Sequence, residues 1–176
     1  MPPGNCQSAC GCAKNKIYTS EYRTNKVVSI GVNGVWNAIQ FMFDVTVPES
    51  HSRVQIESPT GYHWKEFDTF YRFNIKTGQI IPETPCKNCI IEQANPAIVA
   101  TKDGAYAMGS FIKSSPSGMI SYALAYFTGD DKYQTSKWSN VWRTGATAAG
   151  TKYGLLSYIC VGNLNQVVDC MRKMSK

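Results

Sequence analysis

The sequence predicts an all-β protein: an antiparallel β-sandwich, jelly-roll-like, of about eight strands, with one amphipathic C-terminal helix. Two observations predict this class. Apolar residues recur with a period of two in several short runs, and turn residues separate these runs at regular intervals. The period changes to that of a helix only after Asn163. Because no helical pattern occurs between the strands, a parallel βαβ sheet is not expected.

Composition predicts one folded domain with a short appendage. The 176 residues are 43% hydrophobic and 17% charged, which supplies a sizeable core and argues against disorder. We expect an irregular, Cys-rich N-terminal arm over 1–16 and a β-sandwich domain over 17–176. No apolar run reaches the roughly 18 residues that span a bilayer. The N-terminus lacks the basic start and apolar stretch of a signal peptide, so either the protein is not exported by that route or this chain is a mature product that lacks its leader.

The clearest strand lies at 39–47, where five apolar residues alternate with mostly polar ones until Pro48 ends the run. The dipeptide Asp103-Gly104, between two alternating runs, predicts a hairpin. Turn residues at Pro59, Thr60 and Gly61 place the following residues in a surface loop. The further expected strands are 53–57, 67–75, 80–82, 98–101, 105–112, 119–127, 137–143 and 153–161.

The helix is expected over 163–174. Asn163 is a good N-cap, and Gln166 completes a capping box. A stripe at helical spacing should lie on the sandwich; it consists of Leu164, Val167, Val168, Met171 and Met174.

The net charge of +6 is spread over single Lys and Arg residues along the chain. The local cluster of Arg172, Lys173 and Lys176 lies at the end of the helix, where cations offset the helix dipole. A nucleic-acid-binding protein would gather its cations into a stripe. We therefore expect no nucleic acid among the partners.

Seven cysteines leave two interpretations open. They are Cys6, Cys10, Cys12, Cys86, Cys89, Cys160 and Cys170. In an oxidising compartment they form disulfides, with one cysteine free or bonded to a partner chain because the total is odd. In a reducing compartment Cys10, Cys12, Cys86 and Cys89 supply four thiolates to one zinc ion. We favour disulfides and no cofactor. A bond between Cys160 and Cys170 is geometrically conceivable, and a small buried thiol at Cys170 is the alternative.

The motifs of common enzyme classes are missing. The sequence has no glycine-rich phosphate loop, no nucleophile elbow and no His-Glu-x-x-His, and its two histidines are His51 and His63. Glu57, Glu66 and Asp68 are near one another only in sequence, so no catalytic residue is assigned. The turns at 102–104 and 129–131 offer oxygens to calcium, but Asp residues in turns are usually only turn residues.

Aromatic residues are the candidates for ligand binding. Tyr62 and Trp64 fall in the expected surface loop, where exposed rings are unfavourable unless they bind or pack. Alternation puts Trp138, Asn140 and Trp142 on one face of a strand, which would offer flat apolar surface and an amide to a sugar ring. The same alternation places Arg143 on the opposite face. The competing interpretation is that these tryptophans belong to the core.

Three runs carry a resemblance to a known kind of domain. They are Gly104-Ala-Tyr-Ala-Met-Gly109, Lys137-Trp-Ser-Asn-Val-Trp-Arg143 and Tyr158-Ile-Cys-Val-Gly-Asn-Leu164. Together with 37–41 and the turn at 60–62, they resemble a poorly characterised β-sandwich domain of secreted or cell-surface proteins, mainly bacterial. The resemblance spans most of 37–174; Ser139-Asn140 departs from its pattern, and the Cys-rich arm is not part of it. It implies the fold and an extracellular setting, with carbohydrate binding by association only.

These observations lead to three hypotheses about function. The first is a non-catalytic module, extracellular or on the cell surface, that binds carbohydrate or another extracellular ligand through Tyr62, Trp64, Trp138, Asn140 and Trp142. The second is a structural or assembly protein, tethered as a homo- or hetero-oligomer through its Cys-rich arm. The third is an enzyme that acts on carbohydrate.

Overall fold

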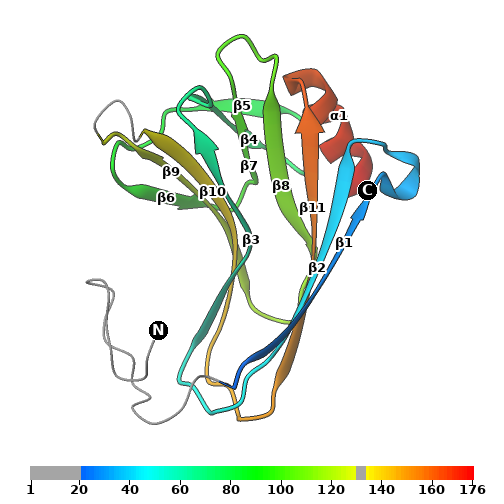
Figure 1. Cartoon of the computed structure of the whole chain (residues 1–176), viewed down its shortest axis with the longest axis vertical. Coiled ribbons are helices and arrows are strands. Elements are labelled where there is room, and N and C mark those ends of the chain that lie inside the picture. Colours follow the sequence, from blue (N-terminus) through cyan, green and yellow to red (C-terminus); the bar gives the residue numbers. More distant parts are fainter. Residues whose placement is uncertain (1–20, 130–133) are drawn as a thin grey trace.

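Antiparallel strands make up most of the chain in a computed structural model, which describes residues 21–129 and 134–176. These residues form eleven strands, one 3-10 turn and one α-helix (Figure 1). The elements are β1 (Arg23–Ile30), η1 (Val32–Gly34), β2 (Ala38–Thr46), β3 (Val54–Trp64), β4 (Thr69–Phe73), β5 (Ile80–Glu83), β6 (Ile90–Gln93), β7 (Ala97–Ala100), β8 (Ala107–Ser114), β9 (Met119–Phe127), β10 (Thr135–Thr144), β11 (Lys152–Gly162) and α1 (Leu164–Ser175).

The strands form two sheets that face each other (Figure 1). The wider sheet has the order β1-β2-β11-β8-β7-β4-β5, and the narrower sheet has the order β3-β10-β9-β6. The pairing is nested, because β2 pairs with β11 in one sheet and β3 pairs with β10 in the other. The predicted all-β sandwich with a C-terminal helix is confirmed, with eleven strands in place of about eight.

The elements that the sequence marked most clearly lie where they were expected. The run at 39–47 forms β2, and the hairpin around Asp103-Gly104 joins β7 to β8. Pro82 lies in β5, at an edge of the wider sheet, where its missing N–H is tolerated. The runs at 119–127, 137–143 and 153–161 form β9, β10 and β11.

Two strands have no signal in the sequence, and one predicted turn is wrong. Both β1 and β6 are edge strands with mostly exposed side chains, so neither needs alternating apolar residues. The segment around Pro59, Thr60 and Gly61 is not a turn but the middle of β3, which is also an edge strand and pairs only with β10. An edge strand accommodates proline where a central strand does not.

The space between the sheets is filled by two apolar clusters. Trp138 and Leu124 pack with Phe70 and Val99 in one, and Trp142 packs with Ile112 and Leu155 in the other. Trp142 is fully buried, and its ring nitrogen donates a hydrogen bond to the carbonyl of Pro116 at 3.1 Å. These tryptophans therefore hold the narrower sheet on the wider one.

A buried ion pair ties the two sheets together on the side of β4 and β5. Arg72 is 2% exposed and donates to a carboxylate oxygen of Glu83 at 3.0 Å. The same guanidinium donates to the carbonyls of Tyr122 in β9 and Ile91 in β6, at 2.9 and 3.3 Å. Because its partners come from both sheets, Arg72 closes this side of the sandwich with a charge whose hydrogen bonds are satisfied.

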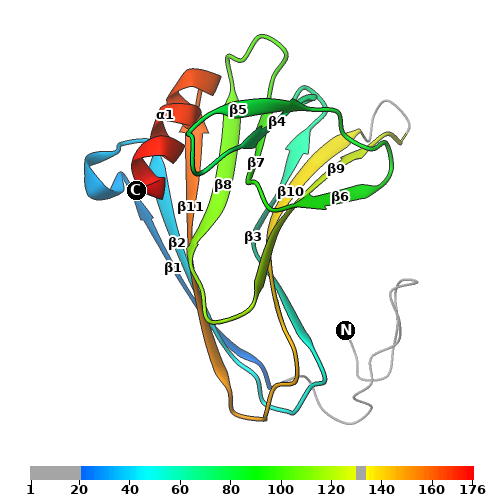
Figure 2. The ribbon, with the colours of Figure 1, turned by 180° about the vertical axis from the view of Figure 1, so that it is seen from behind.

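Helix α1 covers the outer face of the wider sheet (Figure 2). Its capping box is formed by Asn163 and Gln166, as predicted, and its buried stripe packs over β7, β8 and β11. The buried helix residues are Val167, Val168, Cys170, Met171 and Met174. With 12 residues, α1 is too short to cross a bilayer, and the described residues contain no helix that is long and apolar enough to do so.

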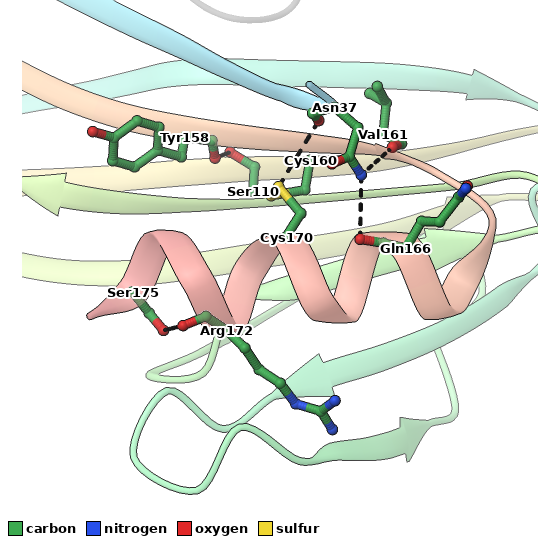
Figure 3. The surroundings of a disulfide bond; sticks show 9 residues. All are labelled: Asn37, Ser110, Tyr158, Cys160, Val161, Gln166, Cys170, Arg172 and Ser175. Atoms are coloured by element: carbon green, nitrogen blue, oxygen red, sulfur yellow. Dashed lines mark hydrogen bonds between the residues drawn. A yellow bond between two sulfur atoms is a disulfide. The ribbon is translucent and has the colours of Figure 1, made fainter. Parts of the chain in front are cut away.

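A disulfide fixes α1 to β11. Cys160 and Cys170 are both buried, with Cα atoms 5.8 Å apart, so the conceivable bond of the sequence analysis is formed (Figure 3). Beside it, the amide of Asn37 donates to the carbonyls of Val161 and Gln166, at 2.8 and 3.2 Å. The start of β2, the end of β11 and the first turn of α1 are therefore joined at one point.

The close approach of α1 to β8 predicts a specific effect of Gly109→Ala. A Cβ atom at Gly109 would lie 2.5 Å from Met171 Sδ and 2.9 Å from Ile98 Cγ1, so the side chains packed between α1 and the sheet must shift. We expect a loss of about 1–3 kcal/mol in the free energy of unfolding, measured by urea denaturation. Gly145→Ala is the matched control, because a Cβ there meets nothing within 4 Å; an equal loss in both variants would contradict this packing.

The disulfide gives a second prediction. Replacing Cys160 and Cys170 together by Ala releases a loop closed over a sequence separation of 10. We expect a loss of about 2–3 kcal/mol in the free energy of unfolding. Reduction should cost the wild-type protein about this much more than it costs the double variant, which keeps only the Cys86–Cys89 pair among the described cysteines. An equal effect of the reductant on the two proteins would contradict the bond between Cys160 and Cys170.

Candidate functional site

The candidate site is the outer face of the narrower sheet, the face that points away from the wider sheet. Strand alternation turns Trp138 and Trp142 inward, so their neighbours in β10 point outward. The outer face is formed by Gln55, Glu57, Thr60, Tyr62 and Trp64 of β3, Lys137, Ser139 and Arg143 of β10, Ser121 of β9 and Glu92 of β6. All of these side chains stand on strands, which hold them in fixed positions.

A β-bulge brings the two halves of β3 onto this face. Val141 pairs with Glu57 and Ser139 pairs with Thr60, so β3 has one residue more than β10 in this stretch. Ser139 Oγ donates to Glu57 Oε2 at 3.0 Å and lies 2.7 Å from Thr60 Oγ1. Without the extra residue, strict alternation would place Glu57 on the face opposite to Thr60 and Tyr62.

Two ion pairs order the polar part of the outer face. Lys137 Nζ donates to Glu57 at 3.1 Å. Arg143 donates through both terminal nitrogens to the two carboxylate oxygens of Glu92, each at 2.7 Å, and through Nε to Gln55 at 2.7 Å. A bidentate pair of this kind holds both side chains in one geometry.

Both carboxylates of the outer face are kept ionised. Burial raises the pKa of Glu57, but hydrogen bonds from Lys137 and Ser139 outweigh it, and the net pKa lies below the usual value. The hydrogen bonds from Arg143 lower the pKa of Glu92. Fixed anions of this kind accept hydrogen bonds and do not supply protons near neutral pH.

Two exposed aromatic rings lie beside this polar network. Tyr62 and Trp64 are each 64% exposed, although they belong to a strand and not to the predicted loop. Being two residues apart on β3, they point to the same side, with a separation of about 7 Å along the strand. Lys137 Nζ lies 5.3 Å from the centre of the Tyr62 ring, which connects the aromatic part of the face to the charged part.

The other three predicted ligand-binding residues are core residues, and the prediction of a surface ladder is wrong for them. Trp138 is 2% exposed, Asn140 is 1% exposed and Trp142 is fully buried. Asn140 donates to Ser110 Oγ at 2.8 Å, and that hydroxyl donates to the carbonyl of Tyr158 at 3.1 Å. Their strand face is covered by the wider sheet, so no ligand outside the protein can stack on it. Arg143 lies on the opposite face, as alternation predicted.

The cysteine predictions are tested only in part. Cys86 and Cys89 lie at disulfide-bonding distance, as do Cys160 and Cys170. Cys6, Cys10 and Cys12 lie outside the described residues, and so does the turn at 130–131 that was considered for calcium. Zinc binding by Cys10, Cys12, Cys86 and Cys89 and tethering through the arm therefore stay predictions. Over 21–129 and 134–176, no group of three or more His, Cys, Asp or Glu side chains has the arrangement of a metal site.

Comparisons with known proteins add little to this description. No protein-family model matches the chain, and no curated protein matches it in sequence. Among solved structures it is similar to a protein from Klebsiella pneumoniae subsp. pneumoniae, provisionally assigned as an aldose 1-epimerase, with 10% identity and a TM-score of 0.34. The match covers 88% of this chain but only 50% of that protein. A likeness this weak carries no inference about function.

On the inner side of β3, between Tyr62 and Trp64, lies a half-buried histidine. His63 packs against Phe67 and Trp138, with ring centres 5.2 and 6.0 Å apart. Its Nε2 atom is buried without a hydrogen-bond partner among the described residues, as are Ser136 Oγ and Trp138 Nε1. Burial lowers the pKa of His63 to about 4, because nothing near it compensates a charge.

This histidine predicts how stability depends on pH. Between pH 6.5 and 4 the unfolded chain binds a proton at His63 that the folded protein does not, so the free energy of unfolding falls as the pH falls through this window. We expect the wild type to lose on the order of 2 kcal/mol more than His63→Gln between pH 7 and pH 4.5, allowing for partial solvent screening. Urea denaturation at both pH values measures this. Equal losses in the two proteins would contradict the burial of the neutral ring.

Proposed function

We propose that the protein is an extracellular, non-catalytic module that binds carbohydrate on the outer face of its narrower sheet. The observation that carries the proposal is the exposure of Tyr62 and Trp64 on one side of a regular strand, next to a row of fixed hydrogen-bonding groups. A single exposed ring is ordinary, but two rings side by side form an apolar patch, and such a patch bordered by polar groups is typical of a binding surface.

Stacking supplies the apolar part of recognition. A pyranose ring has a face of C–H groups, and a flat aromatic ring covers that face while leaving the hydroxyls at its rim free. Two rings about 7 Å apart along a strand offer two such surfaces in a row. Because β3 is hydrogen-bonded to β10 along this stretch, the backbone that carries both rings is ordered before the ligand arrives, which reduces the entropy lost on binding.

The charged groups supply the polar part. Glu57 accepts hydrogen bonds, Lys137 donates them, and Thr60 does both; Lys137, which binds Glu57, also lies 5.3 Å from the centre of the Tyr62 ring. Neighbouring sugar hydroxyls need an alternation of donors and acceptors of this kind. The sugar would add to groups that are already paired, so it leaves no charge unpaired.

The low pKa values of the two carboxylates on this face favour binding over catalysis. Glycoside cleavage needs a carboxylic acid whose pKa is raised so that it can protonate the leaving group. Glu57 and Glu92 have lowered pKa values, and each is held by a cation. An enzyme that uses these two acids as a catalytic pair is therefore the less favoured hypothesis.

The extracellular setting rests on the cysteines. Disulfides persist in oxidising compartments and are rare in reducing ones. Four of the seven cysteines form two pairs at bonding distance, Cys86 with Cys89 and Cys160 with Cys170. Two pairs in one small domain support export.

The test is affinity electrophoresis through gels that contain single polysaccharides, preceded by a glycan array to choose them. We expect Tyr62→Ala and Trp64→Ala each to weaken binding by about tenfold, since one stacked ring contributes on the order of 1–2 kcal/mol. Trp36→Ala and Tyr106→Ala are matched controls, because these rings are 67% and 68% exposed but lie outside β3. The proposal fails if the wild type binds no glycan, or if the control variants lose as much affinity as the two β3 variants.

A further inference from the structure

A groove opens between β2 and the edge strand β3, and it adjoins the outer face at Gln55 and Glu57. It lies where the wider sheet meets the free edge of the narrower one. We call it the β2–β3 groove, and it is lined by Tyr22, Phe43, Val45, Val47, His51, Arg53, Val54, Gln55, Ile56 and Glu57. Its volume of ≈ 420 Å³ falls within the range of small-molecule binding sites.

The floor of the groove is apolar. Phe43 and Val45 come from the inner face of β2, while Val54 and Ile56 come from the inner side of β3. Phe43, Val54 and Ile56 also contact the core cluster around Trp142, so the floor is continuous with the packed interior and is held rigid by it.

The floor extends beyond the groove because the wider sheet extends past the narrower one. β1 pairs with β2 and has no strand of the narrower sheet opposite it. On the inner side of this overhang Val28 pairs with Phe41 and Ile30 pairs with Ile39; Val28 is 54% exposed and Ile30 is 76% exposed. An apolar strip therefore leads from the groove along β1 and β2, long enough for an extended alkyl chain.

Two cations without a carboxylate partner lie at this apolar surface. Lys26 Nζ lies 5.9 Å from the centre of the Phe43 ring, and Arg53 lines the groove. Among the described residues neither forms an ion pair, whereas Glu57 is already paired with Lys137. His51 also lines the groove, and its Nε2 atom is hydrogen-bonded to the hydroxyl of Tyr22. Glu49 lies 3.9 Å from His51, and its side chain is 71% exposed.

We propose that the β2–β3 groove binds a single-chain anionic amphiphile. Its alkyl chain lies on Phe43, Val45 and the strip along β1, and its carboxylate or phosphate head is held between Lys26 and Arg53. The apolar floor selects a chain, and the unpaired cations select a negative head over a positive one. The two proposals share Gln55 and Glu57 at the edge of β3, but the group that would carry each ligand differs: Tyr62 and Trp64 for the sugar, and Phe43, Lys26 and Arg53 for the amphiphile.

Isothermal titration calorimetry below the critical micelle concentration of each compound tests the proposal. Decanoate and decyl phosphate distinguish the two head groups, and decyltrimethylammonium is the cationic control. We expect at least one of the two anions to bind at least about tenfold more tightly than the cation. The double variant Lys26→Gln/Arg53→Gln should lose about tenfold in affinity for that anion. Lys102→Gln/Lys152→Gln removes the same charge from exposed positions outside the groove and should bind like the wild type.

A second variant separates the site from general charge attraction. Val54→Trp fills the groove while leaving both cations in place, and it should abolish binding of the anion with unchanged circular dichroism. Equal binding of anion and cation, an unaffected Lys26→Gln/Arg53→Gln variant, or no binding of any of the three amphiphiles would overturn the proposal. Co-sedimentation with anionic phosphatidylserine vesicles but no binding of monomeric amphiphile would also overturn it, because the surface would then recognise a membrane.

Discussion

The burial of two tryptophans from one strand is the constraint on which the rest of the structure depends. Trp138 and Trp142 lie four residues apart in β10 and both fill the space between the sheets. Because side chains alternate along a strand, this burial forces Lys137, Ser139 and Arg143 to the other side. The charged outer face of the narrower sheet is thus a direct consequence of how its inner face packs.

The neighbouring strand, β3, contains a β-bulge opposite this part of β10. β3 lies at the edge of its sheet, where an extra residue disturbs pairing on one side only. The bulge between Glu57 and Thr60 changes the direction of every following side chain. It turns Tyr62 and Trp64 outward and His63 inward, and it gives Ser139 two partners on β3. A single additional residue therefore assembles the aromatic and the polar parts of the proposed carbohydrate site.

The two edges of the wider sheet differ: one is closed against the narrower sheet and the other is open to solvent. At the side of β4 and β5, the buried Arg72 bonds to groups from both sheets and closes the sandwich. At the other side, β1 and β2 extend past β3 and leave apolar side chains in contact with solvent. Exposed apolar strips of this kind are uncommon on a surface that binds nothing. This asymmetry is the reason why the groove, with its unpaired cations, lies at only one side.

Local pattern was enough to determine the fold class, the central strands, the hairpin at Asp103-Gly104 and the capped helix, because period and capping depend on neighbours in sequence. It also separated the two faces of β10 correctly. It did not determine which face is covered, and so Trp138, Asn140 and Trp142 were assigned to a surface on which they do not lie. Alternation defines two sides of a strand, but only the position of the second sheet decides which side meets water. The same holds for β1, for the bulge in β3 and for the groove, which exist because two sheets of unequal width meet.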